Sequence, residues 1–229
     1  MDVGELLSDT TRYPLSDGKK LITLGLLLII NFLIVPGLLA LGYVFRVLKA
    51  SIAGSNELPD FEQWGEMLVD GLKVVVVQLA YFLIPGLIIF LGLWTSINSL
   101  ISLEGAVKPP TAVFGILGGS LTLGMILLVV FCVIFTIALA NMAYHNSKLG
   151  AAFRFREILE RIVQIGWVDY IIWYVAMIIM GVFFGVIFSI LGFIPVIGWI
   201  ILILLVYPYL YLFYSRSLAL LFVSGFEAE

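Results

Sequence analysis

The sequence predicts an all-α fold, namely a polytopic transmembrane helix bundle of about five spans with two amphipathic helices at its cytoplasmic surface. Composition is the first reason: 62% of the 229 residues are hydrophobic and 12% are charged, and the mean hydropathy is +1.17. A soluble domain carries about a quarter charged residues. The other two reasons are a series of long apolar runs and a pair of polar connectors between them. We therefore expect residues 1–229 to form a single integral membrane domain.

Five runs are long enough to cross the hydrocarbon core of a bilayer, which takes about twenty apolar residues. They cover residues 21–45, 74–97, 112–140, 168–191 and 195–214. The last two are separated by so few residues that they are expected to form a tight helical hairpin. A polar segment, residues 1–20, precedes the first run and lacks the pattern of a cleaved signal. Within it, Ser16 and Asp17 are candidate N-caps for the first helix.

The connectors over residues 58–73 and 151–165 both have the periodicity of an amphipathic helix. The first is expected to be helical from Pro59, because proline suits the first turn of a helix. Eight side chains of the two connectors are candidate contacts for the membrane interface or a partner: Asp60, Phe61, Trp64, Glu66, Asp70, Arg154, Arg156 and Arg161. Because the first connector is mainly acidic and the second mainly basic, we expect them to lie side by side as a cytoplasmic collar. The alternative is that each rests separately on the lipid.

The distribution of lysine and arginine indicates the orientation of the five spans, because basic residues favour the cytoplasmic side. One side of the membrane would carry eight basic residues: Arg46, Lys49, Lys73, Lys148, Arg154, Arg156, Arg161 and Arg216. The other side would carry four: Arg12, Lys19, Lys20 and Lys108. Both long connectors and the C-terminus are therefore expected in the cytoplasm.

A second topology remains open, because Lys19 and Lys20 directly precede the first run on the wrong side for this rule. Residues 21–45 would then form a re-entrant hairpin broken at Pro36-Gly37. Only four true spans would remain, and eleven of the twelve basic residues would be cytoplasmic. Non-helical backbone at that depth requires protein around it. The side of the N-terminus depends on which topology holds.

Several short motifs in the first hundred residues carry a resemblance to a known family. The motifs are Tyr13-Pro14, Lys19-Lys20, Gly42-Tyr43, Leu58-Pro59, Phe61, Trp64 and Asp70-Gly71-Leu72-Lys73. With them the chain resembles an uncharacterised, mainly archaeal family of polytopic membrane proteins, domain of unknown function 4013. The resemblance implies a multi-pass fold in the plasma membrane of a prokaryote. It implies no activity and transfers no catalytic or binding residue.

The residues themselves give no candidate for a catalytic, cofactor-binding or metal-ligating role. The cores of the five runs lack Asp, Glu, Lys, Arg and His, which ion-coupled transporters place inside the membrane. His145 is the single histidine, and no second histidine or nearby cysteine could complete a zinc site with it. We expect His145 to anchor the chain at the interface.

Two pairs of glycines lie one helical turn apart inside apolar runs: Gly115 with Gly119, and Gly181 with Gly185. Such pairs let two helix backbones approach closely. They are candidates either for packing inside the bundle or for self-association.

These observations favour a non-enzymatic membrane protein that acts as a scaffold or assembly partner. Its expected partners are the lipid bilayer and either further copies of the chain or another membrane protein, with no nucleic acid. A channel or uncoupled permease for a small or apolar solute is the alternative. An enzyme that modifies lipids is the third hypothesis.

Overall fold

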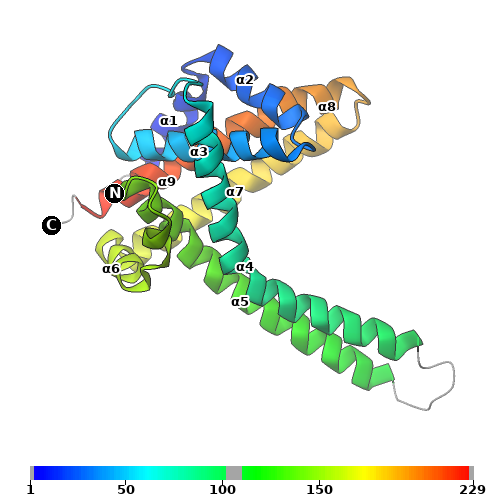
Figure 1. Ribbon diagram of the computed structural model, residues 1–229. Coiled ribbons are helices and arrows are strands. Elements are labelled where there is room, and N and C mark those ends of the chain that lie inside the picture. Colours follow the sequence, from blue (N-terminus) through cyan, green and yellow to red (C-terminus); the bar gives the residue numbers. More distant parts are fainter. Residues whose placement is uncertain (1–2, 102–109, 227–229) are drawn as a thin grey trace. The chain divides into compact units, whose positions relative to one another are not determined.

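The computed structural model of the protein describes residues 3–101 and 110–226 (Figure 1). Over these ranges the chain consists of helices and their connections, without a strand. Within them, five helical stretches are long and apolar enough to cross a membrane: Ile34–Ile52, Trp64–Asn98, Leu117–Tyr144, Trp167–Gly192 and Ile197–Ser224. The expected all-α class and the number of membrane-length helices are confirmed.

The helical elements follow one another along the chain with short connections. They are α1 (Val3–Arg12), the 3₁₀ turn η1 (Tyr13–Leu15), α2 (Gly18–Ile29), α3 (Ile34–Ile52), α4 (Trp64–Ile101), α5 (Pro110–Tyr144), the 3₁₀ turn η3 (Leu149–Phe153), α6 (Phe155–Ile165), α7 (Trp167–Gly192), α8 (Ile197–Ile201), the π-helical turn η4 (Leu202–Val206) and α9 (Tyr207–Ser224). The apolar tail that follows Arg216 lengthens the last helix as far as Ser224.

The chain divides into two compact units, Val76–Thr136 and the remainder. In the smaller unit, parts of α4 and α5 lie against each other. A Cβ atom added to Gly92 would collide with the side chain of Ser120, and one on Gly124 would collide with Ile89. These two glycines therefore allow the helices of this unit to pack closely.

Two helices, α2 and α3, stand where a single span over residues 21–45 was expected. The chain turns at residues 30–33, so the break precedes the Pro36-Gly37 position that the second topology assumed. Pro36 lies in the first turn of α3, where its missing N–H leaves no helical hydrogen bond unmade. The proline therefore marks the start of a helix rather than the break itself.

The starts of α2 and α4 have different causes. The Asp17 carboxylate caps α2 by accepting hydrogen bonds from the backbone N–H groups of Lys19 (2.9 Å) and Lys20 (3.2 Å), so Asp17 is the cap of the two candidates. Helix α4 begins at Trp64, whereas the sequence predicted a helix from Pro59. The reason is that side chains from other elements bind the carbonyl groups that precede Trp64, as described below.

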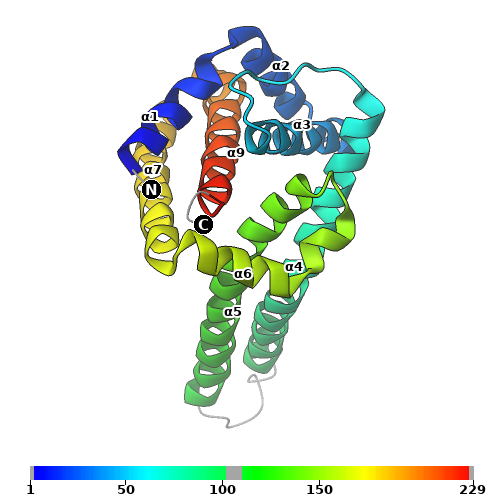
Figure 2. The same ribbon diagram turned by 90° about the vertical axis from the view of Figure 1, so that its left-hand side faces the viewer.

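Helix α9 is the centre of the larger unit and contacts α1, α2, α3, α6 and α7 (Figure 2). Two of these contacts include hydrogen bonds, one buried and one part-buried. The indole N–H of Trp173 donates to the hydroxyl of Ser217 (2.7 Å), and the hydroxyl of Ser215 donates to the carbonyl of Val44 (2.9 Å). These bonds fix α9 to α7 and to α3.

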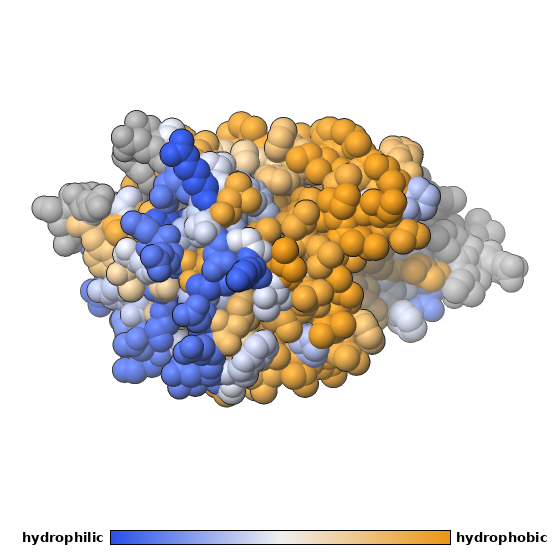
Figure 3. All heavy atoms as spheres, turned by 90° about the horizontal axis from the view of Figure 1, so that it is seen from above, coloured by the Kyte–Doolittle hydropathy of each residue, from blue (hydrophilic) through white to orange (hydrophobic). Residues whose placement is uncertain are grey.

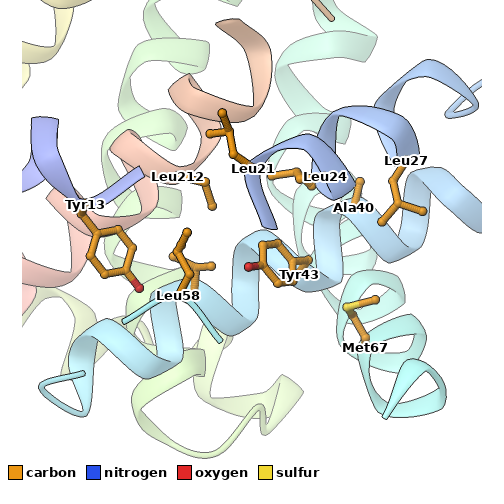
Figure 4. Close-up of a cluster of buried hydrophobic side chains, with 10 residues drawn as sticks. Tyr13, Leu21, Leu24, Leu27, Ala40, Tyr43, Leu58, Met67 and Leu212 are labelled. Carbon is orange, nitrogen blue, oxygen red and sulfur yellow. The ribbon is translucent and has the colours of Figure 1, made fainter. Parts of the chain in front are cut away.

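The hydrophobic core of this unit gathers residues from distant parts of the sequence (Figure 4). It contains Tyr13, Leu21, Leu24, Leu27, Ala40, Tyr43, Val47, Leu58, Met67 and Leu212. These side chains come from η1, α2, α3, the α3–α4 connection, α4 and α9. The core therefore fixes the N-terminal segment, the first connector and the C-terminal helix to one another.

The surface is divided into hydrophilic and hydrophobic regions (Figure 3). In the larger unit, α1 and the end of α9 lie on one side and α8 on the opposite side (Figure 1). The turns α2–α3 and α7–α8 expose large apolar side chains, with Phe32 80% and Phe193 87% exposed. Turns normally carry polar residues on a water-exposed surface. These two turns suit a hydrocarbon environment.

Helices α3 and α4 cross with their backbones in contact at two glycines. A Cβ atom on Gly42 would collide with the carbonyl group of Met67, and one on Gly71 would collide with the carbonyl group of Leu38. Because the obstacle in each case is backbone, it cannot rotate away.

We therefore expect Gly42→Ala and Gly71→Ala each to destabilise the protein by about 1–3 kcal/mol, the usual cost of overpacking. The measurement is thermal unfolding of the purified variants in mild detergent. Gly65→Ala is the matched control, since it lies on α4 with nothing within 4 Å of an added Cβ. Equal melting temperatures for all three variants would contradict the close crossing.

Candidate functional site

The connection between α3 and α4 is held by side chains that donate to its backbone carbonyls. Tyr13 donates to Glu57 (3.1 Å), and Lys20 donates to Leu58 (2.6 Å). The hydroxyl of Tyr43 donates to the carbonyl of Pro59 (3.0 Å). One guanidinium, that of Arg46, reaches three further carbonyls, those of Asp60, Glu62 and Gln63. These bonds hold residues 57–63 in a non-helical path along α3.

Arg216 of α9 completes this attachment from the other end of the chain. Its side chain is 5% exposed, and its Nε lies 2.8 Å from a carboxylate oxygen of Asp9. Its other nitrogens donate to the carbonyl of Ser55 and to the side chain of Asn56, both at 2.7 Å. The guanidinium also lies over the ring of Tyr13, 4.7 Å from its centroid. A planar cation with five donors suits such a multiple junction.

A set of exposed side chains remains on the outside of this ordered backbone, and we call it the connector surface: Asp60, Glu62, Trp64 and Glu66. Each of the four is exposed, Trp64 to 46%. Phe61 lies between them and is fixed by stacking on Tyr43, with ring centroids 3.8 Å apart. Among the expected contact residues of this connector, Phe61 is therefore packed against α3, whereas Asp60, Trp64 and Glu66 are exposed.

Charged groups at the start of α2 interact with the edge of the connector surface. The ammonium group of Lys20 lies 2.7 Å from a carboxylate oxygen of Asp60. The hydrogen bond to Asp60 raises the pKa of Lys20 above its ordinary value. At the start of α2, the hydrogen bond from the backbone N–H of Lys20 is the largest cause that lowers the pKa of Asp17. Both groups are therefore charged at neutral pH.

A further acidic residue of the first connector, Asp70, lines a polar hollow of about 330 Å³ beside the connector surface. It is paired with Lys73, with 3.3 Å between the ammonium nitrogen and the carboxylate oxygen. Glu66 and Lys49 line the same hollow. Two acidic and two basic side chains thus line this hollow.

The arginines of the second connector have other partners than those expected. Arg154, which directly precedes α6, pairs with Glu157 (3.0 Å), and Arg156 pairs with Glu160 (2.8 Å) within α6. The guanidinium of Arg161 lies 3.5 Å from the ring centroid of Phe226. Carboxylates three or four residues away on the same helix are nearer than those of another segment. Helix α6 buries Ile158, Ile162 and Ile165, and the arrangement of the two connectors as a collar stays a prediction.

His145 lies at the end of α5, close to α6. Its Nδ1 is 2.9 Å from the carbonyl oxygen of Asn141, and its Nε2 is 3.8 Å from Glu157. The amide of Asn141 also donates to the carbonyl of Ala151 (2.9 Å). The histidine therefore belongs to a group of polar contacts that joins α5, η3 and α6.

Among the residues that the structure describes, the four glycines chosen as packing candidates have no close contact with another backbone. An added Cβ would meet nothing within 4 Å at Gly115, Gly119 or Gly185, and only the Tyr214 hydroxyl at 3.4 Å at Gly181. Gly115 and Gly119 are exposed, so their role in self-association stays a prediction. Close packing instead occurs at Gly42, Gly71, Gly92 and Gly124, which do not form pairs with a four-residue spacing. Only their contacts in the structure distinguish these glycines from the others.

Arg216 was missed as an important residue, since the sequence presents it as one basic residue in an apolar helix. Its isolation between Phe213 and Phe222 was the available signal, because a lone charge in such a run requires partners. Nothing in the sequence indicated that Asp9 and Asn56 would be those partners.

The comparisons with known proteins give one match. Residues 23–193 match the family described as protein of unknown function, DUF4013. No curated protein and no solved structure matches the chain.

Loss of the Arg216 guanidinium should release the connector from α9 and α1. We expect Arg216→Met to lower the free energy of unfolding by on the order of 3 kcal/mol, as for other buried ion pairs that lose one partner. Thermal unfolding in mild detergent measures the change.

The control is Arg156→Met, because the side chain of Arg156 is 91% exposed and an exposed pair contributes little. If both variants unfold at the wild-type temperature, Arg216 does not hold the connector.

Proposed function

The chain belongs to the DUF4013 family of proteins of unknown function, and we propose that it is a non-enzymatic multi-pass membrane protein that binds a protein partner through its connector surface. The observation that carries this proposal is the connector itself. Its backbone is fixed by Tyr13, Lys20, Tyr43, Arg46 and Arg216. An exposed surface that is already ordered loses little conformational entropy on binding.

The proposed topology places the N-terminal segment and the connector on the same side of the membrane. The contact of Lys20 with Asp60 supports this, because it joins the two segments directly. Arg216 also bridges them, since its guanidinium contacts both Asp9 and Asn56. Helix α2 has 12 residues and is therefore about 18 Å long, too short for a hydrocarbon core of about 30 Å. In this proposal α2 and α3 form a re-entrant hairpin, and four helices cross the membrane.

This topology also satisfies the positive-inside rule better than five crossings. Eleven of the twelve basic residues then lie on the side of both connectors and of the C-terminus, and only Lys108 lies opposite. We assign that side to the cytoplasm of a prokaryotic cell, with the protein in the plasma membrane.

A chemical class of partner follows from the charge of the connector. Residues 54–66 contain four acidic residues and no basic one. Repulsion from anionic headgroups disfavours simple attachment to the lipid surface. Trp64 supplies a half-exposed aromatic side chain of the kind that often dominates the energy of an interface. The proposed partner is therefore a protein with a basic surface and a pocket for an aromatic ring.

A channel or permease for an apolar solute is the second candidate. It is favoured by the α2–α3 hairpin, because both of its helices contact α9 in the larger unit and its turn exposes Phe32. An enzyme that modifies lipids finds less support, because Asp60 and His145 are engaged by separate groups of contacts.

The topology is tested by labelling single cysteines with a membrane-impermeant maleimide in a Cys132→Ala background. Ser8→Cys, Gln63→Cys and Gly150→Cys should react from the same side of oriented vesicles, because the proposal places all three in the cytoplasm. Lys108→Cys should react from the other side. Labelling of Ser8→Cys and Gln63→Cys from opposite sides would restore five crossings.

The partner role is tested by the mass of the complex extracted from native membranes in mild detergent. Trp64→Ala combined with Glu62→Lys and Glu66→Lys should shift the protein to the mass of the lone chain, while its melting temperature stays unchanged because all three side chains are exposed. The matched control is Trp199→Ala, which removes a tryptophan of similar exposure on α8.

If the triple variant keeps the wild-type complex, the connector surface is not the binding site. A complex that contains only copies of this chain identifies the partner as a second copy.

A further inference from the structure

A hollow of about 400 Å³ lies along α3 in the larger unit. This volume falls within the range of small-molecule sites, about 300–1,000 Å³. The residues that α3 contributes recur at helical spacing from Ile34 to Val44, which corresponds to about 15 Å along the helix axis. Leu28 of α2, Val75 of α4 and Tyr211 of α9 complete the wall. The hollow thus extends along α3 far enough to hold a single extended hydrocarbon chain.

Two polar side chains line this otherwise apolar space, the amide of Asn31 and the hydroxyl of Tyr211. Both are exposed, and within residues 3–101 and 110–226 neither side chain has a hydrogen-bond partner. An unpaired amide or hydroxyl in hydrocarbon costs free energy, since lipid tails offer it neither donor nor acceptor.

The wall contains no charged side chain among its described residues. An ionised headgroup would therefore find no counter-charge in the hollow. An uncharged group that both donates and accepts suits Asn31 and Tyr211, because an amide and a phenol each offer both functions. A hydroxyl group has these properties.

We propose that this hollow binds a membrane lipid alcohol, with its hydrocarbon chain along α3 and its hydroxyl group at Asn31 and Tyr211. The inference rests on the membrane location given above and is independent of the connector surface. The proposed function then includes the binding of a lipid from the surrounding bilayer in addition to the binding of a protein partner.

The test uses the full-length protein in mild detergent with two diazirine-bearing probes, a C16 alcohol and the alkane of the same length. The alcohol should cross-link to peptides that contain residues 28–44 or Tyr211. Asn31→Leu combined with Tyr211→Phe should reduce labelling by the alcohol about tenfold, the loss expected for two hydrogen bonds of moderate strength. Labelling by the alkane should not change.

Tyr207→Phe is the matched control, since it removes a hydroxyl from the same helix outside the hollow. As a second test, Leu41→Trp should fill the hollow and reduce labelling by both probes, whereas Leu205→Trp should not. Melting temperatures identify any variant that fails to fold, and the polar double variant changes volume little.

If the alcohol labels the wild type and the double variant equally, Asn31 and Tyr211 do not bind its hydroxyl group, and the proposal of a lipid alcohol is wrong. Cross-links confined to the outer faces of the helices overturn the site. The mass of the protein complex is recorded in the same preparations, so failure here is distinguishable from failure of the partner proposal.

Discussion

The backbone carbonyls of residues 55–63 are the acceptors on which the larger unit depends. Donors reach them from η1, α2, α3 and α9, so four elements share one strip of backbone. Each donor comes from a long polar side chain, and each bond joins positions that are at least 14 residues apart. The strip explains why the first connector is not helical, why the N-terminal segment lies beside it, and why α4 can begin in contact with α3.

The sequence predicted the class of the fold, because apolar length and composition are properties of whole segments. It failed at residues 21–45, where the turn falls on Ile30, Asn31, Phe32 and Leu33, a run with no glycine or proline. The start of α4 was wrong for a related reason. Periodicity measures which face a helix would present, and it contains no information about donors such as Tyr43 and Arg46 that compete for the same carbonyls.

The candidate site was predicted in part. Trp64, Glu66 and Asp60 were identified from the polarity of their segment, and the structure leaves them exposed. The partners of Arg154 and Arg156 could have been predicted from the sequence, because Glu157 and Glu160 follow them at a spacing of three and four residues. The hollow beside α3 could not be predicted from the sequence, because its wall combines residues of α2, α3, α4 and α9.

The position of Arg216 in the chain has a consequence for biosynthesis. Its partners Asp9, Ser55 and Asn56 precede it by 207, 161 and 160 residues. A ribosome therefore completes both connectors long before it adds the residue that fixes the first one, at about 5–20 residues per second. Nascent chains carry an unfinished connector throughout that interval. A partner that recognises the ordered connector would distinguish chains whose last helix is in place from those still being inserted.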